Sequence, residues 1–479
     1  MTEILEPPIK SLNDKKDYRL LKLPNGLTAL LIKNEDVVNK GDSSETKQNI
    51  GALALDISVG SFDDPKEING LSHFLEHMVF MGSEKYPIEN DFFQYITEHA
   101  GETNAMTSQK NTMFYFKIVE DSFVGAMDRL AQFFISPLML ENSVDREIKS
   151  VESEFQNRIN NDYIRSKQIM TSMVHETHRA NSFVPGNFTT LRDNIKSEDL
   201  FNALHKHRAK YYVANRMNLC IQSNIELDIQ QRLVETYFSG IKSGEGAAIV
   251  DENEYKKVFK SEFHDKMFIM KPKEDSNDLE LTWITPSLDK YYKCDPGTYL
   301  STFFGYEGPG SLASYLKKKS LAVITVAGPL SSAFGDNEMF SLFQIVITLT
   351  DHGLQNIDEV IEAVFSYILL CQQTPLDDHK RIYSGIQQIK NINFKYKTER
   401  SEVVNARTLV QKMKIYPASA IITANSIFEE FDGNVISKFI DLLNINNLNI
   451  MLLTKTHDHY DQKEKWFGTE YTTIGKIFI

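Results

Sequence analysis

The spacing of hydrophobic and polar positions predicts a regular succession of elements in the first half of the chain. Two strands, at 27–32 and 51–59, are expected to form a β-hairpin within 18–60, and a polar loop at 34–48 joins them. The first of these strands follows the turn Pro24-Asn25-Gly26. The elements expected after them are a helix within 70–83, a helix over 87–101, paired strands within 103–119, and helices over 121–135 and 142–160.

The second half repeats this order. Its expected elements are strands at 266–271 and 279–284, a helix at 310–319, strands at 322–327 and 343–349, and helices at 356–372 and 376–391. The recurrence predicts two similar α+β domains, at 1–241 and 259–479. Between them, 242–258 is rich in glycine and charge and is interpreted as a linker.

Composition narrows the range of functions. The 479 residues suit two domains, and 42% hydrophobic with 24% charged residues is ordinary for a soluble globular protein. A net charge of -13 argues against a nucleic-acid partner, which requires a basic surface. The same charge is compatible with a cationic peptide substrate. No apolar run approaches the length of a membrane span, so no membrane association is expected.

Cysteine usage and the N-terminus indicate a compartment. The three cysteines, Cys220, Cys294 and Cys371, are widely separated and form no CxxC pattern. Such usage is typical of a reducing compartment. The first 26 residues show neither the apolar core of a signal peptide nor an Arg-rich amphipathic stretch. We therefore expect a cytoplasmic protein.

The strongest candidate chemistry lies in the stretch HFLEH, residues 73–77. On a helix, His73, Glu76 and His77 are spaced i, i+3 and i+4 and project from one face. Two neutral imidazoles and an adjacent carboxylate are what a hydrolytic zinc site needs, and the order HxxEH occurs in such sites. The alternative is three polar residues on an ordinary amphipathic helix. Three polar groups within an apolar run would be costly to bury without a shared role, which favours a metal site.

A third zinc ligand should lie downstream, because catalytic zinc sites use three protein ligands and one open position. The expected helix over 142–160 offers Glu147, Glu152 and Glu154. Glu147 and Glu154 are two turns apart and share a face. The residues alone leave the three candidates open.

Three stretches resemble the insulinase family of zinc peptidases, which carry the inverted motif. These are HFLEHMVFMGSEKYPIENDFF, AGETNAMTSQKNT and GAMDRLAQFFISPLMLENSVDREIKSVESEFQ, and further landmarks occur at 306–320 and 464–471. The family pattern is HxxEH, then 76 residues, then Glu, and 76 residues separate His77 from Glu154 here. The resemblance implies an insulinase/pitrilysin-like α+β fold with two similar domains, each a mainly antiparallel sheet packed with helices.

The resemblance also implies roles for individual residues. His73, His77 and Glu154 would bind one Zn²⁺ per chain, with Glu76 as the catalytic base and Glu147 orienting a zinc-bound histidine. Glu152 is expected to be solvated. A strand carrying Asn104, Ala105, Met106 and Thr107 would pair with the substrate backbone, and a strand near 322–328 would anchor the N-terminal part of a substrate.

The implied function is that of a zinc metalloendopeptidase hydrolysing small peptides and polypeptides, with paired basic residues as one candidate cleavage site. Family members of this type are about twice as long, because two further domains close a chamber over the site. The chain therefore suggests a catalytic half that works with a C-terminal half or a partner chain. The alternative, from a different class, is a zinc- and peptide-binding protein with little unaided activity.

Overall fold

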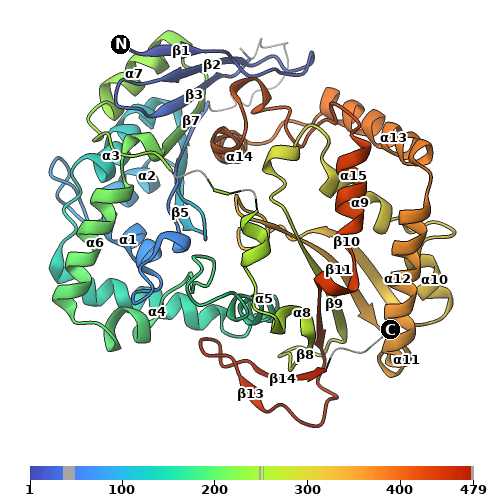
Figure 1. The fold of residues 1–479 in the computed structure, drawn as a ribbon. Coiled ribbons are helices and arrows are strands. Elements are labelled where there is room, and N and C mark those ends of the chain that lie inside the picture. Colours follow the sequence, from blue (N-terminus) through green and yellow to red (C-terminus); the bar gives the residue numbers. More distant parts are fainter. Residues whose placement is uncertain (36–48, 248–249, 252, 476–479) are drawn as a thin grey trace. The chain divides into compact units, whose positions relative to one another are not determined.

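The computed structural model describes residues 1–35, 49–247, 250–251 and 253–475. Their contacts divide into two compact units (Figure 1). The first unit comprises 1–156, 182–248 and 393–426, and the second unit comprises 157–181, 249–392 and 427–479. Each unit thus contains a segment from the other half of the sequence. The division into domains at 1–241 and 259–479, with a linker at 242–258, stays a prediction.

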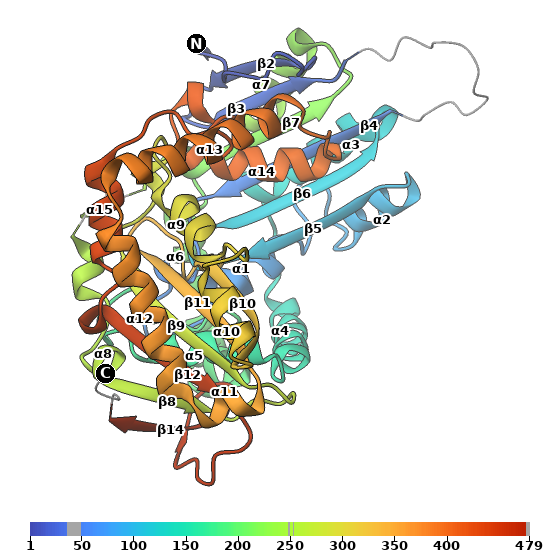
Figure 2. The same cartoon turned by 90° about the vertical axis from the view of Figure 1, so that its right-hand side faces the viewer.

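The first unit is built on a seven-stranded sheet. Its spatial order is β1 (Glu3–Leu5), β2 (Asp17–Lys22), β3 (Thr28–Lys33), β7 (Met217–Ser223), β4 (Ile50–Ile57), β6 (Thr112–Val119) and β5 (Glu102–Thr107). Neighbouring strands are antiparallel except β3 and β7, which are parallel. β5 is the last strand of this sheet, as Figure 2 shows, and among the described residues it pairs with β6 alone.

The predicted hairpin of 27–32 and 51–59 is wrong, although both strands exist as β3 and β4. β7 lies between them, and β3 instead forms its hairpin with β2 across the turn at Pro24-Asn25-Gly26. Gly26 has φ +99°, a left-handed conformation that glycine adopts readily. β3, β4 and β7 are largely buried, so packing in the core selects their partners rather than chain order. Of the predicted loop at 34–48, residues 36–48 lie outside the described part of the chain.

Two layers of helices cover this sheet. One apolar cluster joins the face of Phe114 and Phe116 to the helices α1 (Leu71–Val79), α2 (Asp91–Glu98), α3 (Phe123–Ile135), α4 (Val144–Arg158), α6 (Ser197–Tyr211) and α7 (Leu227–Phe238). A second cluster joins Met113 and Cys220 on the other face to α14 (Glu402–Ile415). The helices predicted around the motif and after it are confirmed as α1 to α4, within a few residues at their ends.

The second unit has the same architecture. Its sheet order is β10 (Ala322–Pro329), β11 (Ser341–Leu349), β9 (Asp278–Thr285), β12 (Leu448–Leu453), β8 (Lys266–Met270), β14 (Glu470–Gly475) and β13 (Gln462–Lys463). Only the pair β12–β8 is parallel among the described strands. The helices of this unit are α5 (Asp162–Ser172), α8 (Glu262–Asp265), α9 (Pro296–Phe304), α10 (Leu312–Lys318), α11 (Asp351–Gln355), α12 (Ile357–Gln373), α13 (Leu376–Lys395) and α15 (Gly433–Asp441). The expected pair of similar α+β folds is confirmed.

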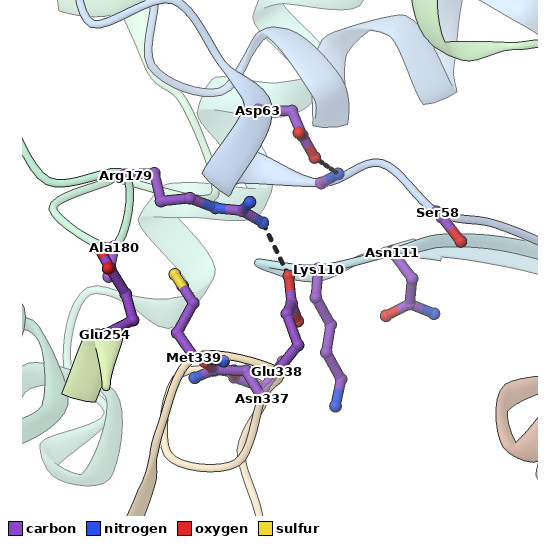
Figure 3. A network of polar contacts seen from close by, with 12 residues as sticks. Ser58, Asp63, Lys110, Asn111, Arg179, Ala180, Glu254, Asn337, Glu338 and Met339 are labelled. Carbon is purple, nitrogen blue, oxygen red and sulfur yellow. Dashed lines mark hydrogen bonds and ion pairs between the residues drawn. The ribbon is translucent and has the colours of Figure 1, made fainter. Parts of the chain in front are cut away.

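Hydrogen bonds between polar groups hold loop segments in place within each unit. In the first unit, Asp63 accepts a hydrogen bond from the backbone nitrogen of Gly60 at 3.2 Å, just before α1 (Figure 3). In the second unit, the guanidinium of Arg179 donates to Glu338 at 2.7 Å, as the same figure shows. No helix in the described ranges is both long and apolar enough to traverse a bilayer.

Candidate metal and catalytic site

The HFLEH motif lies on α1, whose start is held by two glycines and an aspartate. α1 follows Gly70, which has φ +87°, and a Cβ atom there would lie 2.3 Å from the Cα of Gly186. Only glycine permits this approach of two backbones. The carboxylate of Asp64 accepts from the backbone nitrogens of Gly70 (2.9 Å) and Ser72 (2.8 Å). These bonds satisfy donors that the first turn of a helix leaves without partners.

Ser72, His207 and Asp64 form a buried cluster that anchors α1 to α6. The Ser72 hydroxyl donates to Asp64 at 2.6 Å, and Nε2 of His207 lies 2.9 Å from the same oxygen atom of Ser72. Burial lowers the pKa of His207 to about 3, so this imidazole is neutral near pH 7. Burial raises the pKa of Asp64 to about 7, against the hydrogen bonds from Ser72 and Gly70. Because Ser72 is 1% exposed, the cluster holds the helix and offers no accessible nucleophile.

The structure brings together the three residues that the family pattern selects as metal ligands. Nε2 of His73 lies 3.5 Å from one carboxylate oxygen of Glu154, and Nε2 of His77 lies 3.7 Å from the other. Their ligand atoms all lie within 4.8 Å of one another, and no other such group of three His, Cys, Asp or Glu occurs among the described residues. The two histidines come from α1 and the glutamate from α4, all within the first unit.

An acceptor oxygen orients each imidazole by facing its Nδ1, the ring nitrogen directed away from Glu154. Nδ1 of His73 lies 2.7 Å from the carbonyl oxygen of Pro185, and Nδ1 of His77 lies 3.4 Å from Glu147. Acceptors at Nδ1 favour the tautomer in which Nε2 carries a lone pair. Glu147 also accepts from Arg146 at 3.2 Å. Although burial raises the pKa of Glu147, His77 and Arg146 outweigh it and the net shift is downward.

The donor set fits a zinc ion. Two imidazole nitrogens and one carboxylate oxygen are typical zinc ligands, and tetrahedral bonds of about 2.1 Å place neighbouring ligand atoms about 3.4 Å apart. The observed nitrogen–oxygen separations of 3.5 and 3.7 Å are close to that spacing. The pKa of His73 is lowered by burial, but the carboxylates of Glu154 and Glu76 more than reverse this, and its net shift is upward. The cluster therefore concentrates negative charge beside the imidazoles, as a cation site requires.

Glu76 lies beside this cluster and is 7% exposed. The hydroxyl of Thr107 on β5 donates to Oε2 of Glu76 at 2.6 Å. Burial raises the pKa of Glu76, while the neighbouring His73, the hydrogen bond from Thr107 and His77 oppose that shift. The contact between Thr107 and Glu76 was not predicted from the sequence. Strand alternation could have indicated it, because Thr107 is two residues from Ala105, which packs against the core on the α1 side.

The three glutamates left open by spacing have three different environments. Glu154 lies beside Nε2 of both imidazoles, and Glu147 lies beside Nδ1 of His77. Glu152 is half-buried, and its carboxylate accepts from the backbone nitrogen of Phe188 at 2.7 Å. The expectation that Glu152 is simply solvated is therefore wrong, because α4 turns this side chain toward the segment after Gly186.

The residues expected to contact the substrate lie on β5, at the edge of the sheet. Asn104 and Met106 are exposed, whereas Ala105 and Thr107 are half-buried. The side-chain oxygen of Asn104 accepts from the backbone nitrogen of Ala105 at 2.8 Å. Their role in binding a peptide stays a prediction.

Three family models match consecutive parts of the chain. "Insulinase (Peptidase family M16)" matches 42–185, "Peptidase M16 inactive domain" matches 200–381, and "Middle or third domain of peptidase M16" matches 394–475. The first match contains the metal-binding candidates, and the second describes an inactive domain. This division agrees with the position of the candidate site in the first unit.

Similar proteins and structures extend these matches. The chain is 35% identical to nardilysin from Rattus norvegicus over 431 residues, which is 89% of this chain and 37% of that protein. It is 34% identical to insulin-degrading enzyme from Bos taurus over 467 residues, 97% of this chain and 44% of that protein. The crystal structure of pitrilysin matches with a TM-score of 0.89 and 24% identity, over 99% of this chain and 48% of that one, and so supports the fold. The chain spans less than half the length of the curated relatives it matches.

Proposed function

Because the chain belongs to the insulinase family, peptidase family M16, we propose that it is a zinc metalloendopeptidase, or the catalytic part of one, that hydrolyses peptide bonds in small peptides and polypeptides. The observation that carries the proposal is the convergence of His73, His77 and Glu154 next to buried Glu76. A structural role alone does not explain why two imidazole nitrogens and a carboxylate face one another beside a second carboxylate.

In this proposal His73, His77 and Glu154 hold one Zn²⁺ per chain. When bound, the ion would supply Lewis-acid chemistry, polarising a peptide carbonyl and lowering the pKa of a water molecule. The chain contributes the orientation of both imidazoles through the carbonyl of Pro185 and the carboxylate of Glu147. Replacing Glu147 with glutamine should therefore weaken metal binding by roughly 10- to 100-fold, as is usual for partners of metal ligands.

Glu76 acts as the general base and then as the general acid. Its carboxylate would accept a proton from the attacking water and return it to the leaving amine. Thr107 occupies Oε2 of Glu76 as a hydrogen-bond donor, which leaves Oε1 to carry the proton. Burial raises the pKa of Glu76, which makes its carboxylate a stronger base toward the attacking water.

The substrate would bind as an added strand. β5 is the last strand of its sheet in the part of the chain that the structure describes, so its outer edge can pair with the backbone of an extended peptide, and such pairing tolerates many sequences. In the second unit, β10 is also an edge strand, with exposed Val323, Ile324 and Val326, and it suits a second stretch of extended peptide. Each strand, taken within its own unit, is thus a separate candidate for binding an extended peptide.

A quenched fluorescent peptide containing an Arg-Lys pair tests the proposal, with a matched Ala-Ala peptide reporting on dibasic preference. The zinc-loaded wild type should cleave at least one peptide, and Glu76→Gln should cleave about 10²- to 10⁴-fold more slowly with unchanged zinc content. Equal cleavage by wild type and Glu76→Gln would refute Glu76 as the base. Binding of zinc and peptide without cleavage would support the alternative, a binding protein that needs a further chain for turnover.

A further inference from the structure

The edge strand β5 presents two different faces to a peptide. Its register with β6 pairs Asn104 with Tyr115 and Met106 with Met113, and Met113 belongs to the apolar cluster on the α14 side of the sheet. Thr107 instead reaches Glu76 on the α1 side. Because successive side chains of a strand alternate, Asn104 and Met106 lie on the α14 face, away from the metal candidates.

α14 places a guanidinium on this second face. Nη2 of Arg407 lies 3.8 Å from the sulfur of Met106, and the centre of the guanidinium lies 4.1 Å from the centroid of the Tyr115 ring. Met106 is 38% exposed, so the contact lies at the open edge of the strand. Arg407 itself is half-buried and belongs to the first unit.

The charge of Arg407 has no anionic partner among the described residues. No carboxylate oxygen in the described ranges lies within 4.0 Å of this guanidinium, and its buried Nε has no hydrogen-bond partner there. Two other half-buried arginines of the first unit do have carboxylate partners, since Arg19 lies 2.8 Å from Asp228 and Arg129 lies 2.7 Å from Asp91. A guanidinium offers five donors and pairs strongly with carboxylates.

We propose that Arg407 is a specificity-determining residue that selects substrates with an acidic side chain at the position lying beside Met106 on the α14 face. The inference rests on the proposed function, since the peptide must add to the edge of β5. Side chains of neighbouring strands lie about 4.5–5.5 Å apart at Cβ, and diagonal pairs about 7–8 Å apart. A Glu or Asp side chain there reaches the guanidinium that already contacts Met106, and forms a charge-assisted hydrogen bond with it.

The competing explanation gives Arg407 a purely structural role. Stacking on Tyr115 would stabilise the junction of α14 with β6 whatever the substrate. Such a role predicts that every variant of Arg407 changes the cleavage of all peptides equally. A specificity role predicts that the effect depends on the charge of one substrate position.

The test is a set of fluorescent peptides in which one position at a time carries Glu, its neutral isostere Gln, or Lys. With zinc-loaded wild type, kcat/KM should be about three- to tenfold higher for Glu than for Gln at one position. That ratio should fall to about one in Arg407→Met, and in Arg407→Glu the same position should favour Lys. The matched control is Arg381→Met on α13, an exposed arginine paired with Asp378, which should keep the wild-type ratio.

Two further results separate the failure of this inference from the failure of the proposed function. Peptide affinity measured by fluorescence anisotropy in the Glu76→Gln background should show the same Glu-over-Gln preference without any turnover. Cleavage with no Glu preference at any position, or a preference unchanged in Arg407→Met, would overturn the role of Arg407 alone. If neither wild-type cleavage nor peptide binding is detected, the proposed function itself fails.

Discussion

The two units share one sheet topology. Among the described strands each sheet has one parallel pair at the same place, β3–β7 in the first unit and β12–β8 in the second. Strands β3 to β7 and β8 to β12 follow the same connection order. The remaining edge strands differ in origin, because β1 and β2 precede β3 in the chain whereas β13 and β14 follow β12. The comparison teaches that the buried central strands define this fold, and that either end of the sequence can supply the outer strands.

The units differ most in the helix that follows their second central strand. α1 follows β4 and carries His73 and Glu76 in its buried face, whereas α9 follows β9 and buries Tyr299 and Phe304. The second unit also has a buried histidine, His379, but the hydroxyl of Tyr299 and the carbonyl of Cys371 lie within 2.6 and 3.0 Å of its two nitrogens. In contrast, Nε2 of His73 faces Glu154 across a gap suited to an ion.

The largest expected effect follows from this contrast between histidines. If His73 is one of the three proposed ligands, His73→Gln should abolish stoichiometric zinc binding. That loss is larger than the roughly 10- to 100-fold cost of losing an outer partner. The control is His379→Gln, at a buried histidine whose two nitrogens both have hydrogen-bond partners. This variant should leave the zinc content unchanged and lower only the free energy of unfolding. Metal content and a competition titration with a chelator measure both. A His73→Gln protein with wild-type zinc affinity would contradict the assignment.

The next largest effect concerns buried acidic side chains, whose partners differ between the two units. In the second unit Glu280 pairs with Lys167 at 2.9 Å, and both side chains are buried. Glu280→Gln leaves this ammonium without its anion and should lower the free energy of unfolding by about 3–5 kcal/mol. Both tryptophans, Trp283 and Trp466, lie in the second unit, so their fluorescence during urea unfolding reports on it. The pair Lys167→Met/Glu280→Met should recover most of the loss, and no recovery would argue against the ion pair as its cause.

In the first unit the buried Asp56 has an amide, Asn111, as its hydrogen-bond partner. Burial raises the pKa of Asp56 from 3.8 to about 7, against the hydrogen bond from Asn111 and the charges of Lys414 and Lys110. The folded state thus binds a proton that the unfolded chain releases, so the stability linked to Asp56 is present below pH 4 and is lost as pH rises through 7.

The resulting prediction is that wild type loses on the order of a few kcal/mol relative to Asp56→Asn between pH 5 and pH 8. Asparagine does not ionise, so the variant lacks this linkage. Urea unfolding at both pH values measures the difference, with Asp17→Asn, at an exposed position of β2, as the control. Parallel pH dependence of wild type and Asp56→Asn would show that the carboxyl does not titrate in this range.

The smallest expected effect compares two left-handed glycines, Gly70 before α1 and Gly310 before α10, with φ of +87° and +84°. A Cβ at Gly310 meets no atom within 4 Å, whereas one at Gly70 meets the backbone of Gly186. Gly310→Ala should therefore cost about 1 kcal/mol of conformational strain. Gly70→Ala should cost more and should also weaken zinc binding, because α1 must shift. Equal losses in thermal unfolding, with unchanged metal affinity, would show that the close approach is unimportant.

Much of the local structure could be predicted from the sequence. The spacing of His73, Glu76 and His77 places them on one helical face because every α-helix has the same geometry, and α1 has that face. Most predicted strands and helices exist for the same reason, since hydrophobic periodicity reflects local backbone geometry. The helix α9 was not predicted, because it is short and opens with Pro296-Gly297, residues that usually mark a turn.

The spacing of residues along the chain indicated which side chains could bind a metal, but it did not indicate which of three glutamates is the third ligand. That choice depended on the family spacing. In the structure, Glu154 is the glutamate that lies beside the imidazoles, and its role as a ligand stays a prediction. Only the tertiary structure decided that β7 separates β3 from β4, that Thr107 holds Glu76, and that α14 brings Arg407 to the edge of β5. These contacts join residues that are far apart in the chain. Burial and packing of the whole unit select the partners, and the periodicity of a short stretch carries no information about them.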